Sequence, residues 1–213
     1  MPEPEVDRSV GEPLAPQPPE SHVATLQHSA WVTRWVGRPS GFDRLLDFAC
    51  GSGRHTRLAL ARGFRVLAVD RDRGLLDMGQ NKNLEARVED LESGRWSFSA
   101  ERFQVVVVTN FLFRPRLDLL AALLAPGGRL VYETFAHGNA AYGKPSNPSF
   151  LLQPDELFLL GRRAGLQVRA VEQGYTPSPK PSLVQRIVAL RLPAGVDSLP
   201  LSVPPSGTGA GLS

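Results

Sequence analysis

Four consecutive valines, Val105 to Val108, constrain the fold of this chain more than any other feature. Together with Phe103 and Gln104 they form a largely β-branched run with too little polarity for the edge of a sheet. Such a run is typical of a strand in the centre of a parallel sheet, whose two faces are both covered by helices. The rest of the chain must therefore supply neighbouring strands and the helices that connect them.

Short apolar runs alternate with helical patterns on both sides of this strand. The predicted further strands are residues 44–48, 65–69, 85–89, 129–135, 166–171 and 183–192, and the predicted helices are residues 29–36, 54–62, 72–79, 115–125 and 153–165. A proline-rich loop too short for a helical crossover joins the last two strands, so they should be antiparallel. The pattern predicts an α/β, Rossmann-like three-layer sandwich with a mostly parallel seven-stranded sheet and an antiparallel last strand.

The composition favours one domain. The chain has 213 residues, of which 42% are hydrophobic, enough for a single buried core. Residues 1–20 and 193–213 are rich in Pro, Gly and Ser, so we expect two mobile tails around a domain at residues 21–192. No segment approaches the roughly 20 apolar residues of a membrane span, and the N-terminus does not resemble a secretory signal.

Charge and cysteine content narrow the class of partner. The formal net charge is +3 and the basic residues are scattered, so nucleic acid binding is not indicated and a small-molecule substrate is expected. Cys50 is the only cysteine, which excludes an intrachain disulfide and a cysteine-based zinc cluster. These features fit a cytoplasmic protein, and no metal site is predicted.

The turn at Ala49 to Gly53, after the first predicted strand, is the candidate ligand site. In such sheets ligands bind beyond the carboxyl ends of the strands, where the strand order reverses. Gly51 and Gly53 allow close approach of a ligand and positive φ angles, and the next helix offers unpaired N–H groups at its start. An anionic group fits there, although a plain tight turn would use the same glycines.

Acidic residues end the next two predicted strands. Asp70 follows the glycines by about twenty residues, the distance at which a carboxylate can accept both hydroxyls of a ribose. Asp90, with Leu91 beside it, could face an adenine ring in the same way. A solvated loop acid or a helix cap is the alternative interpretation of each carboxylate.

These stretches together resemble the class I S-adenosylmethionine-dependent methyltransferase family. The matching segments are residues 45–53, 69–70, 89–91 and 124–130, within a region of roughly 31–192. The resemblance implies that Asp47 steadies the glycine loop and the amino acid end of the cofactor, and that Gly51 and Gly53 border its methionine part. It further implies that Asp70 holds the ribose and Asp90 the adenine. The full set of expected cofactor contacts is Asp47, Ala49, Cys50, Gly51, Gly53, His55, Asp70, Arg71, Glu89, Asp90, Leu91 and Asn110.

The sequence Cys-Gly-Ser-Gly-Arg-His at residues 50–55 is similar to that of small bacterial single-domain enzymes of this family, including the tellurite-resistance type. His55 could reach the cofactor or substrate, or cap and pack on the first helical turn. Cys50 is expected to be a packed small residue, because methyl transfer from a sulfonium needs no covalent enzyme intermediate. Ala49 stands where the family usually has its first glycine, which makes that position tighter.

Candidate catalytic residues follow the predicted strands at residues 103–108 and 129–135. Asn110 comes directly after the central strand, where it could orient a substrate or serve only as a turn residue. The segment 136–150 has little helical or strand periodicity and contains His137 and Tyr142. Because loops of this length are usually functional or disordered, we expect a lid that carries a candidate general base.

Two rival functions remain open at this point. A nicotinamide-dependent oxidoreductase also has a glycine fingerprint after the first strand, but it would require glycine at the position of Thr56. A noncatalytic cofactor-binding protein of the same fold would keep Gly51, Gly53 and Asp70 without turnover.

Overall fold

The computed structural model describes residues 27–72, 74, 78–93 and 95–197. The expected tail at residues 1–20, nearly all of the expected tail at 193–213 and half of the helix expected at 72–79 lie outside the described residues. Residues 193–197, which are described, contain a turn closed by a hydrogen bond from the Val196 N–H to the Pro193 carbonyl.

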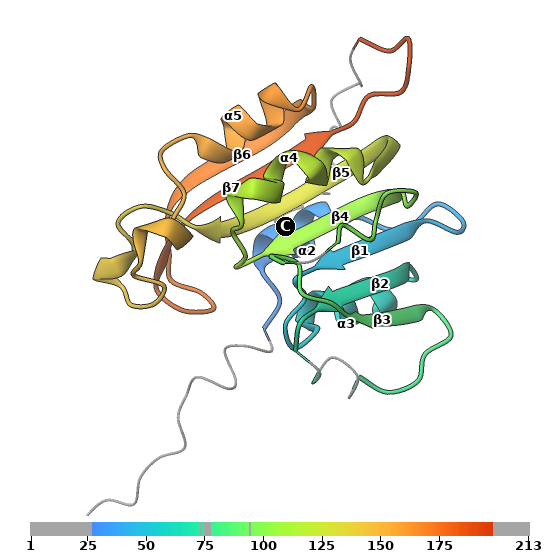
Figure 1. The fold of residues 1–213 in the computed structure, drawn as a ribbon, viewed down its shortest axis with the longest axis horizontal. Helices are drawn as coiled ribbons and strands as arrows, with labels where there is room; N and C mark the ends of the chain where they lie inside the picture. The colour runs from blue at the N-terminus through green and yellow to red at the C-terminus, as the bar shows by residue number, and fades with distance from the viewer. Residues whose placement is uncertain (1–26, 73, 75–77, 94, 198–213) are drawn as a thin grey trace, which may run out of the picture.

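Within the described part of the chain, seven strands form one sheet (Figure 1). They are β1 Arg44–Phe48, β2 Arg65–Asp70, β3 Leu84–Val88, β4 Phe103–Thr109, β5 Leu124–Phe135, β6 Gln167–Thr176 and β7 Ser182–Leu190. The strand order is β3-β2-β1-β4-β5-β7-β6, and β7 runs antiparallel to both of its neighbours while the other pairs are parallel. The predicted mostly parallel sheet with an antiparallel last strand is confirmed.

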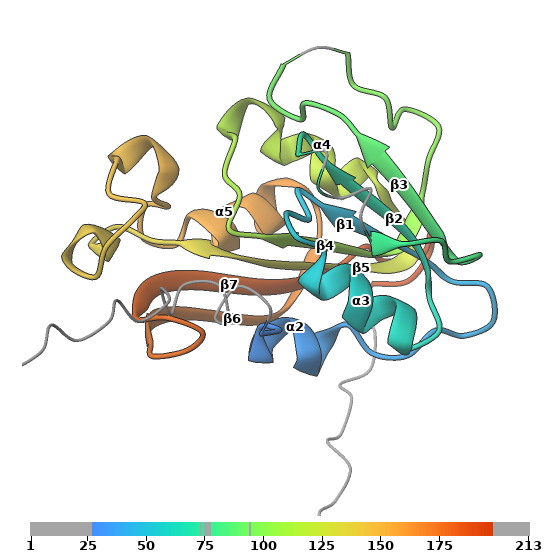
Figure 2. The ribbon, with the colours of Figure 1, turned by 90° about the horizontal axis from the view of Figure 1, so that it is seen from below.

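Helices cover both faces of this sheet (Figure 2). Helices α2 (Ala30–Trp35) and α3 (Arg54–Ala61) lie on one face, and α4 (Leu117–Ala122) and α5 (Glu156–Arg163) lie on the other. Short 3₁₀ turns occupy Arg114–Arg116 (η2), Asn139–Ala141 (η3) and Pro148–Phe150 (η4). The predicted three-layer sandwich is therefore confirmed.

The central valine run contributes to both cores. Val106 and Val108 belong to the cluster that packs against α4 and α5, whereas Val105 and Val107 belong to the cluster that packs against α2. All four side chains are fully buried. Because successive side chains in a strand point to opposite faces, only an apolar run without alternation suits this position.

Two element boundaries differ from the prediction by five residues. Strand β5 begins at Leu124, five residues earlier than expected, and Leu124 pairs with Phe103 instead of ending the helical stripe. A Cβ on Gly128 would come within 2.8 Å of the Ala125 carbonyl oxygen, so the irregular start of β5 requires glycine there. At the other edge, β6 continues to Thr176, beyond the predicted end at residue 171.

Among the described residues, no helix is both long enough and apolar enough to cross a membrane.

Candidate functional site

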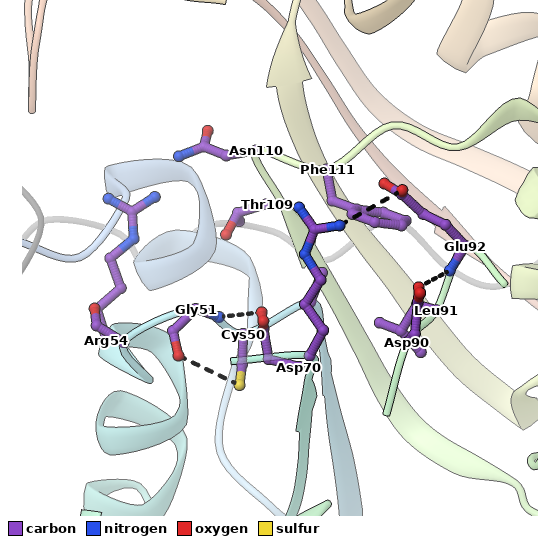
Figure 3. A pocket seen from close by; sticks show the side chains of 13 residues that line it. Cys50, Gly51, Arg54, Asp70, Asp90, Leu91, Glu92, Thr109, Asn110 and Phe111 are labelled. Carbon is purple, nitrogen blue, oxygen red and sulfur yellow. Dashed lines mark hydrogen bonds and ion pairs between the residues drawn. The ribbon is translucent and has the colours of Figure 1, made fainter. Parts of the chain in front are cut away.

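The strand order reverses between β1 and β4, and a cleft opens beyond the carboxyl ends of β1, β2 and β4 (Figure 3). Its volume is about 310 Å³, at the lower end of the range for small-molecule sites. The lining residues are Ala49, Cys50, Gly51, Ser52, Arg54, Asp70, Arg71, Asp90, Leu91, Glu92, Thr109, Asn110 and Phe111. The cleft therefore lies where the sheet topology predicts a ligand.

The glycine loop forms one wall of this cleft. Ala49, Gly51 and Gly53 have φ angles of 57°, 55° and 74°, so the loop passes through the left-handed region three times. A Cβ on Gly51 would meet nothing within 4 Å, whereas one on Gly53 would approach the Met78 sulfur to 2.1 Å. Gly53 is buried as the N-cap of α3 and does not line the cleft, so only Gly51 offers the expected open approach.

Asp70 joins the end of β2 to the glycine loop. Its carboxylate accepts a hydrogen bond of 2.7 Å from the Gly51 N–H and another of 2.9 Å from the Asp72 N–H. The glycine loop and the acid of the neighbouring strand thus converge on one point, as the sequence predicts. Each carboxylate oxygen retains acceptor capacity toward the cleft.

The third strand supplies the far side of the cleft. Asp90 lines the cleft, but its carboxylate accepts hydrogen bonds from the Ser93 hydroxyl at 2.6 Å and from the backbone N–H groups of Glu92 and Ser93. These bonds, that of the hydroxyl first, lower the pKa of Asp90. Its main contacts hold the turn after β3, while the Leu91 and Phe111 side chains give this end of the cleft an apolar surface.

Arg54 and the two acids Asp90 and Glu92 lie on opposite sides of the cleft (Figure 3). Arg54, in the first turn of α3, lies on one side and donates to the Gln27 carbonyl oxygen. Asp90 and Glu92 lie on the opposite side, where Arg71 forms an exposed ion pair of 3.8 Å with Glu92. The arrangement suits a ligand with an anionic end and a hydroxyl-bearing end.

Asp47 lies beneath the loop and is not among the residues that line the cleft, so the structure does not support a direct contact with a ligand. Its Oδ2 accepts a hydrogen bond of 2.6 Å from the Thr56 hydroxyl in the first turn of α3, while Oδ1 has no partner among the described residues. Complete burial raises the pKa of Asp47 to about 6. The carboxyl group therefore holds the start of α3 against β1.

His55 does not line the cleft, and its ring contacts agree with the capping and packing alternative and not with a direct contact to a cofactor. Its Nε2 accepts from the Ser29 N–H at 3.1 Å, and its Nδ1 lies 3.2 Å from the Thr109 Oγ1. Burial, followed by the charges of Arg54 and His28, lowers the pKa of His55 to about 3. The ring is therefore a neutral, buried link between α2, α3 and β4.

Two further sequence candidates have structural roles. Cys50 lines the cleft but is nearly buried, and burial raises the pKa of its thiol so that it stays protonated. This agrees with the expected packing residue. Glu89 lies outside the cleft lining and accepts a hydrogen bond from the Ser97 hydroxyl, so the structure does not support its expected cofactor contact.

Asn110 is the one candidate catalytic residue that lines the cleft. It adopts a φ of 55°, and its N–H donates to the carbonyl of Glu133 on β5. Asparagine tolerates the left-handed region better than most residues, so this conformation at the end of β4 is compatible with its side chain. The position at the switch point agrees with the sequence prediction.

The segment 136–150 is folded and lies beyond the end of β5 (Figure 1). The Asn139 side chain accepts from the Leu183 N–H and donates to the Pro145 carbonyl, which ties the segment to β7. Tyr142 is 47% exposed and stacks on Tyr175 of β6 with ring centroids 5.2 Å apart.

His137 is exposed, and neither it nor Tyr142 lines the cleft, so their assignment as general bases is not supported. The expected lid is thus a segment packed against the β6–β7 hairpin.

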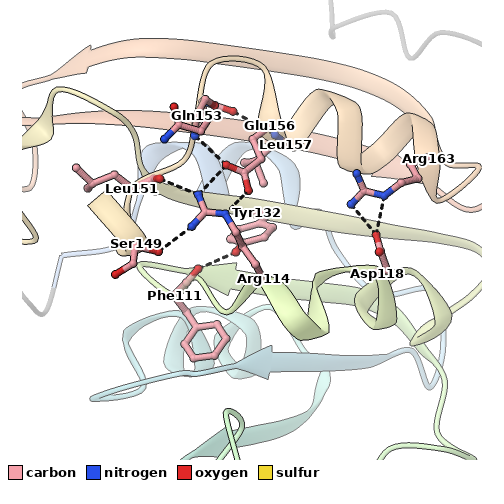
Figure 4. Close-up of polar contacts among 11 residues, drawn as sticks. Phe111, Arg114, Asp118, Tyr132, Ser149, Leu151, Gln153, Glu156, Leu157 and Arg163 are labelled. Carbon is pink, nitrogen blue, oxygen red and sulfur yellow. Dashed lines mark hydrogen bonds and ion pairs between the residues drawn. The ribbon is translucent and has the colours of Figure 1, made fainter. Parts of the chain in front are cut away.

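A polar cluster fixes the segment that follows β4 (Figure 4). The Tyr132 hydroxyl donates to the Phe111 carbonyl at 2.7 Å, which positions one wall residue of the cleft. Arg114 pairs with both carboxylate oxygens of Glu156 at 2.7 and 2.8 Å and donates to the carbonyl oxygens of Ser149 and Leu151. The segment from Phe111 to Arg114, which follows β4, is therefore held by β5 and by the start of α5.

Residues 45–128, which contain β1 to β4 and the glycine loop, match the model of a family described as a methyltransferase domain. The matched part comprises 84 of the 213 residues, and its description agrees with the class I S-adenosylmethionine-dependent methyltransferase family that the sequence motifs resemble. The sheet order, the cleft at the switch point and the Gly51–Asp70 contact all lie in or beside this part of the chain.

Two curated relatives are similar in sequence to this chain. The demethylmenaquinone methyltransferase of Clavibacter sepedonicus is 33% identical over 113 residues, covering 49% of this chain and 46% of its own. The cypemycin N-terminal methyltransferase of a Streptomyces species is 29% identical over 163 residues, covering 68% of this chain and 66% of its own. The chain thus spans about half to two thirds of the length of these relatives.

Solved structures share the fold at low sequence identity. TehB from Haemophilus influenzae has a TM-score of 0.57 with 17% identity, covering 71% of this chain and 58% of its own. The 1,6-didemethyltoxoflavin-N1-methyltransferase of Burkholderia thailandensis has a TM-score of 0.57 with 19% identity, covering 88% of this chain and 98% of its own. These similarities support the methyltransferase fold.

Sequence reasoning missed five residues that line the cleft: Ser52, Arg54, Glu92, Thr109 and Phe111. Each is a direct chain neighbour of a predicted site residue. The signal that could have found them is the strand-end position itself, because a loop that holds one cleft residue usually presents the next one as well.

Proposed function

We propose that this protein binds S-adenosylmethionine in the cleft and transfers its methyl group to a small-molecule acceptor. The observation that carries the proposal is the convergence of the Gly51 N–H and the Asp70 carboxylate, 2.7 Å apart, at the point where the strand order reverses. The contact holds the open glycine loop beside a carboxylate that keeps acceptor capacity for hydroxyl groups, and a ribose at the switch point needs such an acceptor.

The residues of the cleft fit this cofactor. Gly51 has no neighbour that a Cβ would meet, so a ligand can approach its backbone closely. Asp70 would hold the ribose hydroxyls, and the apolar Leu91 and Phe111 side chains would flank the adenine. The Arg54 guanidinium, on the opposite side of the cleft, would face the amino acid end.

Bound S-adenosylmethionine supplies an electrophilic methyl group on a sulfonium. The protein has to align the acceptor atom with that methyl, and positioning of this kind contributes about 7 to 11 kcal/mol to lowering a barrier. Asn110 presents its side chain at the end of β4 and would orient the acceptor by hydrogen bonds. His137 and Tyr142 lie outside the cleft lining, so the proposal includes no general base.

The rival nicotinamide-dependent function is less compatible with the loop. The third fingerprint glycine would stand at Thr56, but the Thr56 hydroxyl is buried and bonded to Asp47 beneath α3. A noncatalytic cofactor-binding protein of the same fold differs from the proposed enzyme only in turnover, which the assay below separates.

The acceptor class and the location of the protein are parts of the proposal. A net charge of +3 gives little support to a nucleic acid acceptor, and one relative is named for demethylmenaquinone, a small molecule. The single cysteine has a buried, protonated thiol, which is compatible with the reducing cytoplasm.

The test begins with calorimetric titration of the purified protein with S-adenosylmethionine, S-adenosylhomocysteine and NAD. Saturable binding of the first two without NAD binding would support the cofactor assignment, and the reverse result would overturn it. Release of S-adenosylhomocysteine in the presence of small-molecule fractions of a cell extract then tests turnover. Cofactor binding without any product would favour the noncatalytic alternative.

A further inference from the structure

Three residues from distant parts of the chain form a line of polar contacts that ends at the cleft. The Ser29 N–H lies 3.1 Å from the His55 Nε2, and the His55 Nδ1 lies 3.2 Å from the Thr109 Oγ1. All three residues are buried, and Thr109 is the member that lines the cleft.

The first contact determines which ring nitrogen of His55 carries the proton. A backbone N–H can only donate, so Nε2 must accept the hydrogen bond from Ser29 and cannot itself be protonated. The proton of the neutral ring is therefore on Nδ1, which donates to the Thr109 oxygen. A protonated imidazolium would direct two hydrogen atoms at each other between Nε2 and Ser29, so the geometry excludes it.

The second contact determines the direction of the Thr109 hydroxyl. Because its oxygen accepts from His55, its own proton is free to be donated elsewhere, and among the described residues no other group accepts it. The side chain is only 8% exposed, and its remaining open side is the cleft. A buried hydroxyl donor without a partner in the protein is costly unless a ligand accepts its proton.

The chemical surroundings indicate what such a ligand offers. Figure 3 shows Thr109 and the Arg54 guanidinium on the side of the cleft away from Asp90 and Glu92. Guanidinium and hydroxyl groups are both donors, and two donors on the same side of a cleft favour an anionic oxygen.

We propose that Thr109 donates a hydrogen bond to the carboxylate of the bound S-adenosyl ligand, and that His55 is the positioning residue that turns the Thr109 hydroxyl toward it. This inference rests on the proposed function, because it names a contact with the same cofactor.

The support behind His55 is rigid. The Ser29 hydroxyl donates to the Glu133 carboxylate at 3.0 Å and accepts from the N–H groups of Trp31 and Val32 as the N-cap of α2. Arg186 also donates to the same carboxylate of Glu133. The Ser29 N–H is thereby held in place by β5, β7 and α2, so the direction imposed on Thr109 is fixed before any ligand binds.

The experiment compares two ligands and two variants by calorimetry. S-adenosylmethionine has the carboxylate, and decarboxylated S-adenosylmethionine lacks only that group. Thr109→Val removes the hydroxyl at nearly constant volume, and we expect it to weaken S-adenosylmethionine binding about tenfold, as for the loss of a hydrogen bond to a charged group. Binding of the decarboxylated ligand should change less than twofold, and Thr109→Ser should restore most of the affinity for S-adenosylmethionine.

A spectroscopic measurement on the unmodified protein tests the role of His55 without any ligand. The imidazole ¹⁵N shifts should show the Nδ1–H form at every pH between 5 and 8. An Nε2–H form, or titration of the ring in that range, would overturn the positioning role. This measurement tests the positioning role of His55 even where Thr109→Val fails to fold.

The outcomes separate this inference from the proposed function. Equal weakening of both ligands by Thr109→Val, or no weakening of either, would overturn the contact with the carboxylate while leaving cofactor binding intact. Failure of the unmodified protein to bind either ligand would instead contradict the proposed function.

Discussion

Removal of the Asp70 carboxylate is the sharpest test of the proposed cofactor site. Asp70 is half-buried at the end of β2, lines the cleft and accepts the Gly51 N–H at 2.7 Å. In Asp70→Ala the ribose hydroxyls lose their common acceptor, and the Gly51 N–H loses the group that holds the loop. We therefore expect a large effect on affinity and a small one on stability.

The two effects have different magnitudes. A hydrogen bond to a charged group contributes about 1.5–3 kcal/mol, and loss of one such contact at the cleft corresponds to a Kd raised about 10- to 100-fold. The contact with Gly51 is exposed to solvent, so its loss should cost about 1 kcal/mol of unfolding free energy, or about 3 °C in Tm.

Calorimetric titration with S-adenosylhomocysteine and thermal denaturation measure the two quantities separately. Asp72→Ala is the matched control, because Asp72 is an exposed acid two residues away that does not line the cleft. Its Kd should stay within twofold of that of the unmodified protein. A normal Kd in folded Asp70→Ala would refute the assignment of Asp70, and an equal loss in both variants would show that the effect is general electrostatics.

Three further predictions concern stability. Ala49→Gly should raise Tm by about 1–3 °C, as measured by calorimetry. The left-handed φ of 57° costs alanine about 1–2 kcal/mol, whereas glycine adds an entropic cost of about 0.5–1 kcal/mol. A lower Tm would contradict this reasoning. The raised pKa of Asp47, about 6, means that the folded state binds a proton more readily than the unfolded state, so its contribution is present below about pH 4 and is lost as the pH rises through 6. Relative to the unmodified protein, Asp47→Asn should therefore gain up to about 3 kcal/mol of unfolding free energy between pH 4 and pH 7 in urea titrations, and a constant difference would refute the burial argument. The lowered pKa of His55, about 3, has the opposite sign: its contribution is present above about pH 6.5 and is lost as the pH falls toward 3, and it cancels in this comparison because both proteins keep His55. Arg114→Gln breaks the ion pair in which Arg114 contacts both carboxylate oxygens of Glu156 (Figure 4). It should lower Tm by about 3 °C and speed amide hydrogen exchange at residues 149–156. Unchanged exchange at these residues would show that the contact does not hold the segment.

The fold was largely predictable because its main signals are local. The valine run 105–108, the alternation of strand and helix patterns and the glycines after the first strand each depend on a few adjacent residues. The boundaries that were wrong depend on pairing. Residues 124–128 resemble the end of a helix, yet they extend β5, because Leu124 pairs with Phe103 and the Gly128 position admits no Cβ.

The site was predictable where it coincides with strand ends and unpredictable where it depends on tertiary contacts. Asp70 and Asn110 follow directly from the topology. The packing role of His55 could not be distinguished from a cofactor contact in the sequence, because its partners Ser29 and Thr109 are 26 and 54 residues away. The position of Tyr142 outside the cleft lining could not be predicted, because its contact with Tyr175 of β6 depends on how a remote hairpin packs. No pattern within one segment contains that information.

The ends of β1 and β4 share a feature that connects strain with function. Ala49 and Asn110, which follow these two neighbouring strands, are both non-glycine residues in the left-handed region, with φ angles of 57° and 55°. Backbone hydrogen bonds hold both turns, from the Cys50 N–H to the Val69 carbonyl and from the Asn110 N–H to Glu133. Such conformations persist only where the surrounding structure fixes them, and they are concentrated at ligand sites. Because asparagine tolerates this conformation better than alanine, most of the strain lies on the glycine-loop side, where the proposed cofactor would contact the backbone.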